Sequence, residues 1–240
     1  MDSKDSKNES FANNDSILTE IDDFLASCSN FSHLQASNDD CKIAINEFKI
    51  FGLTEIVGLP GVGKTKLICK CVENYCCIYI TNGIVDFAVP ENFLIKRINS
   101  FLELQSFILK KLETLIILCK NKNKEPDTFI VIDGLDRFLY TVEHPRFQAS
   151  EITKIVQCLK FFIIKYKIKV IIINNFFNNS SWTERKLLYN KYLGYSWCYQ
   201  PNIKFIIIKK TDNCEILNIK GEIIKKFKII NNQIEFINKF

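Results

Sequence analysis

The stretch GLTEIVGLPGVGKTKL, residues 52–67, decides the fold that the sequence predicts. Its apolar run Leu53–Val57 is typical of a buried strand, and residues 58–65 match G-x-x-x-x-G-K-[ST] at every fixed position. In such a loop, backbone N–H groups and the first turn of the next helix surround a chain of phosphates. Lys64 is expected to reach the β- and γ-phosphates of a nucleotide, and the Thr65 hydroxyl to bind Mg²⁺. The predicted cofactors are therefore ATP and Mg²⁺, and the predicted nucleotide-binding residues are Gly58, Leu59, Pro60, Gly61, Val62, Gly63, Lys64, Thr65 and Lys66.

A phosphate-binding loop of this kind also needs a carboxylate at the end of a neighbouring strand, to hold the metal through water. Asp133 closes the apolar run Phe129–Ile132 and meets this requirement, so Thr65 and Asp133 are the predicted metal-binding residues. The alternative is that Asp133 only caps a turn after the strand. Asp136 is a weaker candidate for the metal, because no strand aims its side chain at the phosphates.

Length and composition favour one large α/β domain, since the chain has 240 residues, 47% of them hydrophobic and 25% charged. The most apolar region, Val156–Phe177, contains four lysines and is not expected to span a membrane. The start of the chain, MDSKDSKNES, has the features of neither a signal peptide nor a transit peptide. The sequence therefore predicts a soluble intracellular protein without membrane contact.

The ten cysteines are expected to be reduced thiols in the core. No two of them are spaced as C-x-x-C, and the chain has only two histidines, so a zinc site is the less favoured alternative. The cysteines that lie in apolar runs are Cys69, Cys71, Cys76, Cys77, Cys119 and Cys158.

Charge is unevenly distributed along the chain. Residues 1–40 hold 2 basic and 9 acidic side chains, residues 41–150 hold 14 and 12, and residues 151–240 hold 16 and 6. The basic C-terminal part has the charge needed to contact a polyanion such as DNA. The alternative is that its lysines only solvate strand edges and helix surfaces.

The order of the predicted elements indicates a mostly parallel sheet. Residues 1–15 predict a disordered acidic arm, and residues 16–240 a core, with a leading helix and linker at 16–50 and the ATPase fold at 51–240. Strands that alternate with helices predict crossover connections and a sheet covered on both faces. The predicted strands are 51–57, 76–81, 128–133 and 169–175, and the predicted helices are 64–74, 94–120 and 150–166. The strand-like runs 201–210, 214–219 and 226–237 have no helix between them and predict an antiparallel C-terminal extension.

Several segments resemble the RecA/RadA recombinase family, and in particular its eukaryotic recombinase paralogues. The resemblance covers residues 16–237 and is nearest the D-type paralogue, which also has Asn-Gly where others have Glu-Gly. The segments are IDDFL (21–25) for the family's LDxLL, residues 52–67 for the first strand and Walker A, CCIYITNG (76–83) for LYIDTEG, FIVID (129–133) for Walker B, VIIINN (170–175) for VVITN, and LGYSWCYQPNIKFIIIKK (193–210) for LGxSWxxxPxxRxxL.

The resemblance implies a RecA-like P-loop NTPase core and a role in homologous recombination and the repair of DNA double-strand breaks in the nucleus. It also implies partners, namely other recombinase paralogues or the recombinase itself in a hetero-oligomer, and single-stranded DNA. The family's N-terminal helical domain is expected to be missing, because few residues precede the P-loop.

Two departures from the family predict weak ATP hydrolysis or none. The family has a water-polarising glutamate at the end of its second strand, whereas this chain has Asn82 there, in a segment one residue shorter. An amide cannot take the proton of water, and loss of a general base typically lowers the rate about 10²- to 10⁴-fold. The family's γ-phosphate-sensing glutamine is replaced by Phe176, after Asn174 and Asn175. The chain is expected to be at most a weak DNA-dependent ATPase.

The segment 176–191 lies where the family carries a DNA-contacting loop. Positive and aromatic side chains together suit single-stranded DNA. The alternative is that the aromatic side chains dock onto a partner subunit. The candidates are Arg185, Lys186 and Lys191 for phosphates, and Trp182, Phe177 and Tyr189 for stacking on bases. Trp197, in contrast, is expected to pack in the core.

Three other functions remain open from the residues alone. In a non-catalytic scaffold subunit of a recombinase-paralogue complex, the P-loop would be structural or vestigial. An active DNA-dependent ATPase that remodels recombinase filaments would need another carboxylate, such as Asp86 or Glu91. A small-molecule kinase is disfavoured, because the sequence has no lid-like arginine cluster or second substrate motif.

Overall fold

The computed structural model describes residues 52–85, 90, 92–122, 128–139, 145–175, 193, 197, 199–231 and 233–237. Within these residues one sheet of nine strands has the order β3-β2-β4-β5-β1-β6-β7-β8-β9. The strands are β1 (Gly52–Gly58), β2 (Cys76–Thr81), β3 (Phe93–Arg97), β4 (Thr128–Asp133), β5 (Lys169–Asn175), β6 (Ile203–Lys209), β7 (Cys214–Leu217), β8 (Ile223–Ile230) and β9 (Gln233–Ile237).

The sheet is parallel from β3 to β6 and antiparallel beyond. The P-loop strand β1 lies between β5 and β6 and pairs in parallel with both. Strand β5 in turn separates β1 from β4, the strand that ends at Asp133. Strands β6 to β9 pair antiparallel with one another in sequence order. The prediction of a mostly parallel α/β sheet with an antiparallel C-terminal extension is confirmed.

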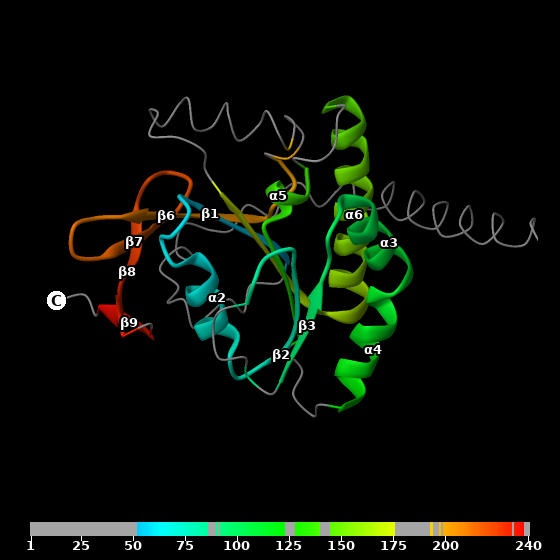
Figure 1. Ribbon diagram of the computed structural model, residues 1–240, viewed down its shortest axis with the longest axis horizontal. Coiled ribbons are helices and arrows are strands. Elements are labelled where there is room, and N and C mark those ends of the chain that lie inside the picture. Colours follow the sequence, from blue (N-terminus) through cyan, green and yellow to red (C-terminus); the bar gives the residue numbers. More distant parts are fainter. Residues whose placement is uncertain are drawn as a thin grey trace, which may run out of the picture. The chain divides into compact units, whose positions relative to one another are not determined.

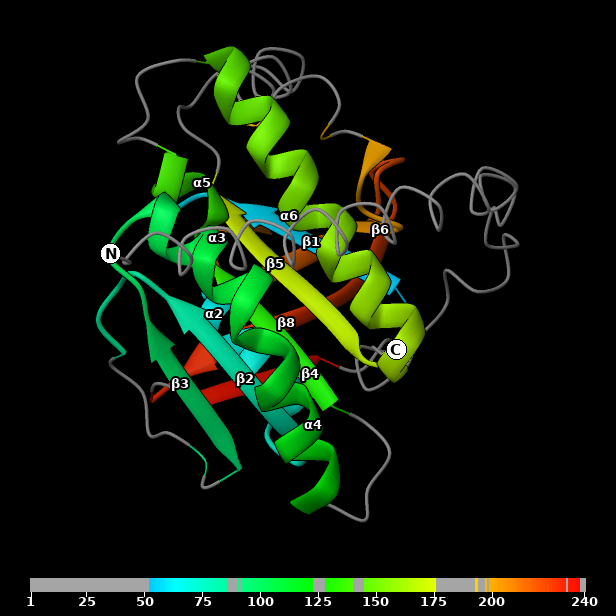
Figure 2. The same ribbon diagram turned by 90° about the vertical axis from the view of Figure 1, so that its right-hand side faces the viewer.

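Helices cover both faces of the parallel strands (Figures 1 and 2). One face carries α3 (Phe101–Lys110), α4 (Leu112–Lys122) and α6 (Pro145–Tyr166), and the other carries α2 (Lys64–Val72). The short helix α5 (Leu135–Leu139) follows β4. Buried apolar side chains form one core beneath α3, α4 and α6, and a second core between α2 and the sheet. Burial on both faces explains why the central strands read as continuous apolar runs.

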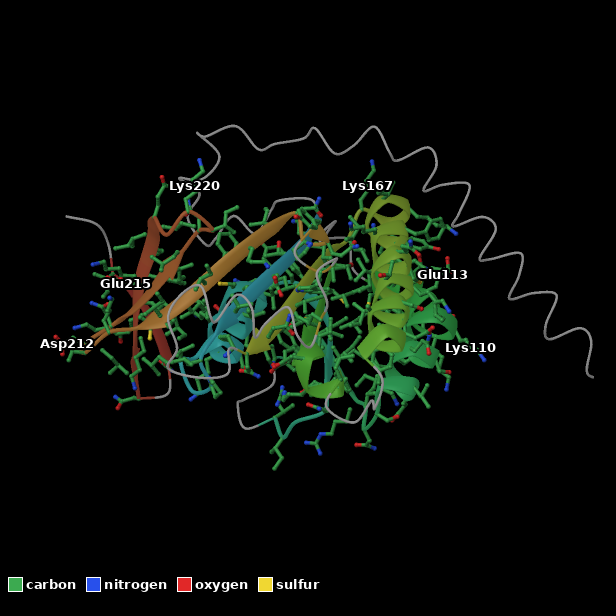
Figure 3. The ribbon with its side chains drawn as sticks, turned by 90° about the horizontal axis from the view of Figure 1, so that it is seen from above. Lys110, Glu113, Lys167, Asp212, Glu215 and Lys220 are labelled. Carbon is green, nitrogen blue, oxygen red and sulfur yellow. The ribbon has the colours of Figure 1, made fainter. Side chains whose placement is uncertain are left out.

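The antiparallel extension contributes to the second core. Cys214 of β7, Phe227 of β8 and Ile234 of β9 are buried in the same cluster as Leu67 of α2. Figure 3 shows Asp212 and Glu215 of this extension on the opposite side of the molecule from Lys110 and Glu113 on the helical side. The last three strands therefore form part of the wall around the helix that follows the P-loop.

The helix predicted over residues 94–120 is wrong at its start and in its continuity. Phe93–Arg97 instead forms the edge strand β3, whose side chains are alternately half-buried and exposed at its start. Helix α3 begins only after Ser100, whose hydroxyl accepts a hydrogen bond from the Glu103 N–H. In the sequence, the apolar residues of β3 continue the helical spacing of α3 and α4. The short strand, with its alternation of side chains, was therefore not recognised.

Two other predicted boundaries also differ from the structure. The helix predicted from Ser150 begins at Pro145, a residue type that favours the first position of a helix. The single run predicted over residues 226–237 is two strands, β8 and β9, joined by a turn at Asn231. Asn231 has a φ of 48°, a left-handed conformation that asparagine tolerates better than most residues.

The described cysteines are free thiols, and those in the core are buried, which agrees with the prediction of reduced core cysteines. Burial raises the pKa of Cys69 to about 12 and that of Cys158 likewise to about 12, so both stay protonated at neutral pH. None of the described helices has both the length and the apolar character needed to cross a membrane.

A charged side chain lies at the centre of the sheet. Glu55 of β1 is fully buried, and its Oε2 forms an ion pair with Nζ of Lys204 on β6 at 2.9 Å. Its Oε1 accepts hydrogen bonds from Nε1 of Trp197 at 2.6 Å and from Nδ2 of Asn174 at 2.8 Å. Trp197 is therefore a core residue, as predicted. Burial raises the pKa of Glu55, and the charge of Lys204 and the hydrogen bonds oppose this effect.

Replacing Glu55 by Gln should change how stability depends on pH. The folded state favours the protonated carboxyl more than the unfolded state does, because the pKa of Glu55 is raised above its ordinary value of 4.5. The resulting stabilisation is fully present below that value and is lost as the pH rises through the raised pKa. Relative to Glu55→Gln, the native chain should lose up to about 1.4 kcal/mol of unfolding free energy per pH unit in that window. Urea unfolding across this pH range measures the difference, and parallel pH profiles for the two proteins would contradict it.

Candidate functional site

The carboxyl ends of four parallel strands meet at one edge of the sheet, the edge at which open α/β sheets bind ligands. The register places Gly58 of β1 opposite Asn175 of β5, and Asp133 of β4 opposite Thr81 of β2. The P-loop leaves β1 at this edge and enters α2 at Lys64. Strand pairing therefore brings together polar groups that are far apart in the sequence.

Gly63 holds the turn between the P-loop and α2. Its φ of 87° is left-handed, a conformation that glycine adopts without steric cost. A Cβ at this position would also collide with Cδ1 of Ile229 on β8. Nearby, Sγ of Cys214 on β7 lies 3.6 Å from the Val62 carbonyl oxygen. The antiparallel extension thus lies directly against the P-loop.

Lys64 is 6% exposed, and its ammonium group is fully paired inside the protein. Nζ donates to the carbonyl oxygens of Gly58 and Leu59 and to Oδ1 of Asn175, each at 2.9 Å. Burial lowers the pKa of Lys64 to about 8, while nearby aspartates oppose this effect. Because an ammonium group has three hydrogens, Lys64 must give up at least one of these acceptors to bind a phosphate.

Asp133 accepts hydrogen bonds from three side chains at the end of β4. The hydroxyls of Thr65 and Tyr79 both donate to its Oδ2, at 2.8 and 2.5 Å. Nη2 of Arg137 pairs with its Oδ1 at 3.1 Å and also donates to its backbone carbonyl at 3.0 Å. Burial and the charge of Asp133 raise the pKa of Tyr79, so this hydroxyl stays protonated and remains a donor.

The pair formed by Thr65 and Asp133 fits a magnesium site of the kind that nucleotides bring with them. One hydroxyl and one carboxylate, 2.8 Å apart, are the oxygen ligands that Mg²⁺ prefers beside a P-loop. The described residues contain no group of three or more His, Cys, Asp or Glu side chains that could hold a metal ion. Magnesium at this place would therefore take its remaining ligands from phosphate oxygens and water.

Asp136 is tied to the P-loop more closely than the sequence indicates. Its buried Oδ2 accepts hydrogen bonds from the N–H and Nδ2 of Asn175, at 3.2 and 3.3 Å. Its own N–H donates to Oδ1 of Asn174 at 3.0 Å. Burial raises the pKa of Asp136, and the bonds from Asn175 oppose the shift. Since Asn175 also accepts from Lys64, Asp136 positions the side chain that holds the P-loop lysine.

The end of β2 carries no acidic side chain within the described residues 82–85. Asn82 is exposed there, and the N–H of Gly83 donates to Oγ1 of Thr81 at 3.0 Å. The guanidinium of Arg137 lies beside Gly83, with Nη1 3.1 Å from where a Cβ of residue 83 would be. Sequence reasoning missed this arginine. Arg137 follows Asp133 by four residues, and this spacing could have indicated that the two side chains pair.

The predicted site residues fall into two groups: those that the structure brings together, and those that lie outside the described residues. The structure brings the P-loop, from Gly58 to Lys66, together with Asp133 at one edge of the sheet. The other candidates lie outside the described residues, so their roles stay predictions; they are Arg185, Lys186, Lys191, Trp182, Phe176, Phe177, Tyr189, Asp86, Glu91, the acidic arm 1–15 and the leading segment 16–50.

No protein-family model and no curated protein matches this sequence. Among solved structures, 390 chains match. One of them is an ATPase domain that is 14% identical and has a TM-score of 0.54, over 79% of this chain and 85% of that chain. At this identity the likeness shows the fold alone. The chain has a RecA-like α/β fold.

Replacing Gly63 by Ala should destabilise the protein more than replacing Gly61 does. Both residues have positive φ, so either alanine should cost about 1 kcal/mol of backbone strain. A Cβ at Gly61 meets nothing within 4 Å, whereas at Gly63 it would lie 2.4 Å from Cδ1 of Ile229, an exposed side chain whose end must turn aside, which should add about 0.5 to 1.5 kcal/mol. The double variant Gly63→Ala/Ile229→Val lacks this Cδ1 and should recover the added loss. Unfolding free energies of the variants test this, and equal losses at the two glycines would contradict it.

Proposed function

We propose that this chain is an ATP-binding paralogue of the RecA-type recombinases that assists homologous recombination and the repair of DNA double-strand breaks. It binds Mg²⁺–ATP with weak hydrolysis or none. It works in the nucleus, in a hetero-oligomer with other recombinase paralogues or with the recombinase itself, and it contacts single-stranded DNA.

The observation that carries ATP binding is the meeting of Lys64, Thr65, Asp133 and Asn175 at one strand edge. Lys64 donates to Asn175 and Thr65 donates to Asp133, so each of these two pairs is held in place by a hydrogen bond. The P-loop backbone and the start of α2 add the N–H groups and the partial positive charge that favour phosphate. Three elements from distant parts of the chain therefore converge on the place where a triphosphate and its metal would lie.

Weak hydrolysis follows from the state of the carboxylates at this edge. Hydrolysis needs a group that accepts a proton from the attacking water. Asp133 is already engaged by two hydroxyls and a guanidinium, and buried Asp136 is bound to Asn175. At the end of β2, the recombinases that the sequence resembles have a glutamate, and this chain has Asn82. The described part of the site therefore holds a triphosphate better than it splits one.

The recombination role is supported by the order of the recombinase-like segments along the chain. The most specific of them, LGYSW, contains Trp197, which is buried and donates to Glu55 at the centre of the sheet. The segment that follows supplies Lys204, which completes the ion pair of the same glutamate. The motif and the strand after it thus hold the buried glutamate of β1, which explains why this motif occurs together with the pairing of β1 and β6.

The purified chain should bind Mg²⁺–ATP and turn it over slowly. Lys64→Ala should weaken ATP binding about tenfold or more, because it removes a charge-assisted contact to phosphate. Lys70→Ala, at an exposed position later in the same helix, is the control and should leave binding unchanged. Equilibrium binding with a labelled nucleotide and phosphate release with and without single-stranded DNA are the measurements.

Two outcomes of this experiment would replace the proposal. Rapid turnover that depends on DNA and disappears in Lys64→Ala would make the chain an active ATPase that remodels recombinase filaments. Failure of the native chain to bind ATP at all would make the P-loop vestigial and the chain a scaffold subunit.

Neutralising Arg185, Lys186 and Lys191 together should weaken binding to single-stranded DNA. Each lost phosphate contact should also lower the salt dependence of the affinity, by about 0.7 in the logarithmic slope for single strands. A control variant neutralises three exposed lysines outside the basic C-terminal part instead, namely Lys70, Lys110 and Lys111. Affinities measured at several salt concentrations compare the two variants.

Unchanged DNA affinity in the loop variant would show that residues 176–191 are not a DNA interface. The tagged native chain, purified from cell extract, should bring recombinase paralogues with it. If the loop variant loses these proteins but keeps its DNA affinity, the loop is a protein interface. If no such protein co-purifies with the native chain, the recombination role is wrong.

A further inference from the structure

The guanidinium of Arg137 lies in a space left by two glycines at neighbouring strand ends. Gly134, directly after β4, has a φ of 85°, and a Cβ there would overlap the Nε and Nη2 atoms of Arg137. Gly83, after β2, has the Nη1 atom of Arg137 beside it, 3.1 Å from where its Cβ would be. A side chain at Gly134 would displace the guanidinium and one at Gly83 would crowd it, so the two strand ends leave room for it.

This guanidinium uses only part of its hydrogen-bonding capacity. Nη2 donates to the carbonyl oxygen of Asp133 and to its Oδ1, at 3.0 and 3.1 Å. Nε is buried and has no hydrogen-bond partner. The side chain is 34% exposed, so a ligand at this edge can reach it. Since a guanidinium carries five N–H donors in a fixed fork, it has donors left for a further acceptor.

Arg137 and Thr65 are bound to the two oxygens of a single carboxylate. Thr65 donates to Oδ2 of Asp133 and Arg137 pairs with Oδ1. A metal held by Thr65 and Asp133 would neutralise charge on the terminal phosphates of a bound nucleotide. The γ-phosphate of a bound nucleotide would thus lie close to the carboxylate that Arg137 contacts.

We propose that Arg137 is a specificity-determining residue for the third phosphate, so that the site distinguishes ATP from ADP by a guanidinium of its own chain. The inference rests on the proposed function, in which the P-loop binds ATP. Arginine forms paired, charge-assisted hydrogen bonds with phosphate oxygens, and its planar fork suits this contact better than an ammonium group does. A guanidinium cannot take a proton from water, so the residue that recognises the γ-phosphate does not help to split it.

The test compares the affinities for ATP and for ADP, both with Mg²⁺, in the native chain and in Arg137→Gln. The native chain should prefer ATP. The variant should bind ATP about tenfold more weakly or worse, which corresponds to one lost charge-assisted hydrogen bond, and its affinity for ADP should change less than about twofold. Arg97→Gln makes the same charge change at an exposed position at the end of β3 and should leave both affinities unchanged.

A second variant separates recognition from stability, because loss of Arg137 also removes a partner of Asp133. Gly134→Ala keeps the positive charge but would place a Cβ 2.0 Å from Nε of Arg137, so the guanidinium must move and the preference for ATP over ADP should fall while the protein still carries the arginine. The ratio of the two affinities is the readout, since a general loosening of the P-loop would lower both together.

An equal loss for ATP and ADP in Arg137→Gln, or no loss for either, would overturn the proposal, because Arg137 would then only steady Asp133 or play no part in binding. Tighter ATP binding in this variant would also overturn it, and would mean that Arg137 competes with the metal for the carboxylate. If the native chain binds neither nucleotide, the proposed function fails, and this inference fails with it.

Discussion

The carboxylate of Asp133 is the interaction on which the rest of the site depends. Thr65 joins it to the P-loop, Tyr79 joins it to β2, and Arg137 joins it to α5. Three donors on two oxygens compensate for the partial burial of the negative charge, which would otherwise be costly. A metal that enters between Thr65 and Asp133 would join an arrangement already fixed by these bonds. The site is therefore preorganised on the side of the metal.

A second set of polar groups connects this edge with the middle of the sheet. Lys64 donates to Asn175, Asn175 donates to Asp136, the N–H of Asp136 donates to Asn174, and Asn174 donates to Glu55. Buried networks of this kind are stabilising only when their members are paired, and they hold neighbouring elements in one arrangement. The two asparagines at the end of β5 point to opposite faces of the strand. Asn174 contacts buried Glu55, and Asn175 contacts Lys64 of the P-loop.

The sequence predicts the parts of this structure that depend on local pattern. The P-loop and the strands of the central sheet are recognisable because their motif and their continuous apolar runs are local. The short edge strand β3 was hidden, since only the cap at Ser100 separates its apolar residues from the helical spacing of α3 and α4. The roles of Asp136 and Arg137 could not be derived, because they depend on which strand ends lie side by side. Two features decide these roles: the register between β1 and β5, and the space that Gly83 and Gly134 leave for Arg137. Both depend on how distant strands pair and not on any single segment.

The central place of β1 in the sheet has a consequence for how the protein is made. Lys64 meets Asn175 across 111 positions of the chain, and Val62 meets Cys214 across 152. Contacts of such long range slow folding, because a large loop must close before they form. During synthesis, the P-loop strand β1 is made well before its pairing strands β5 and β6. Until they are made, its apolar side chains and unpaired backbone groups can form non-native contacts. Because Cys214 of β7 and Ile229 of β8 lie against the P-loop, its surroundings are completed only when these late strands have joined the sheet.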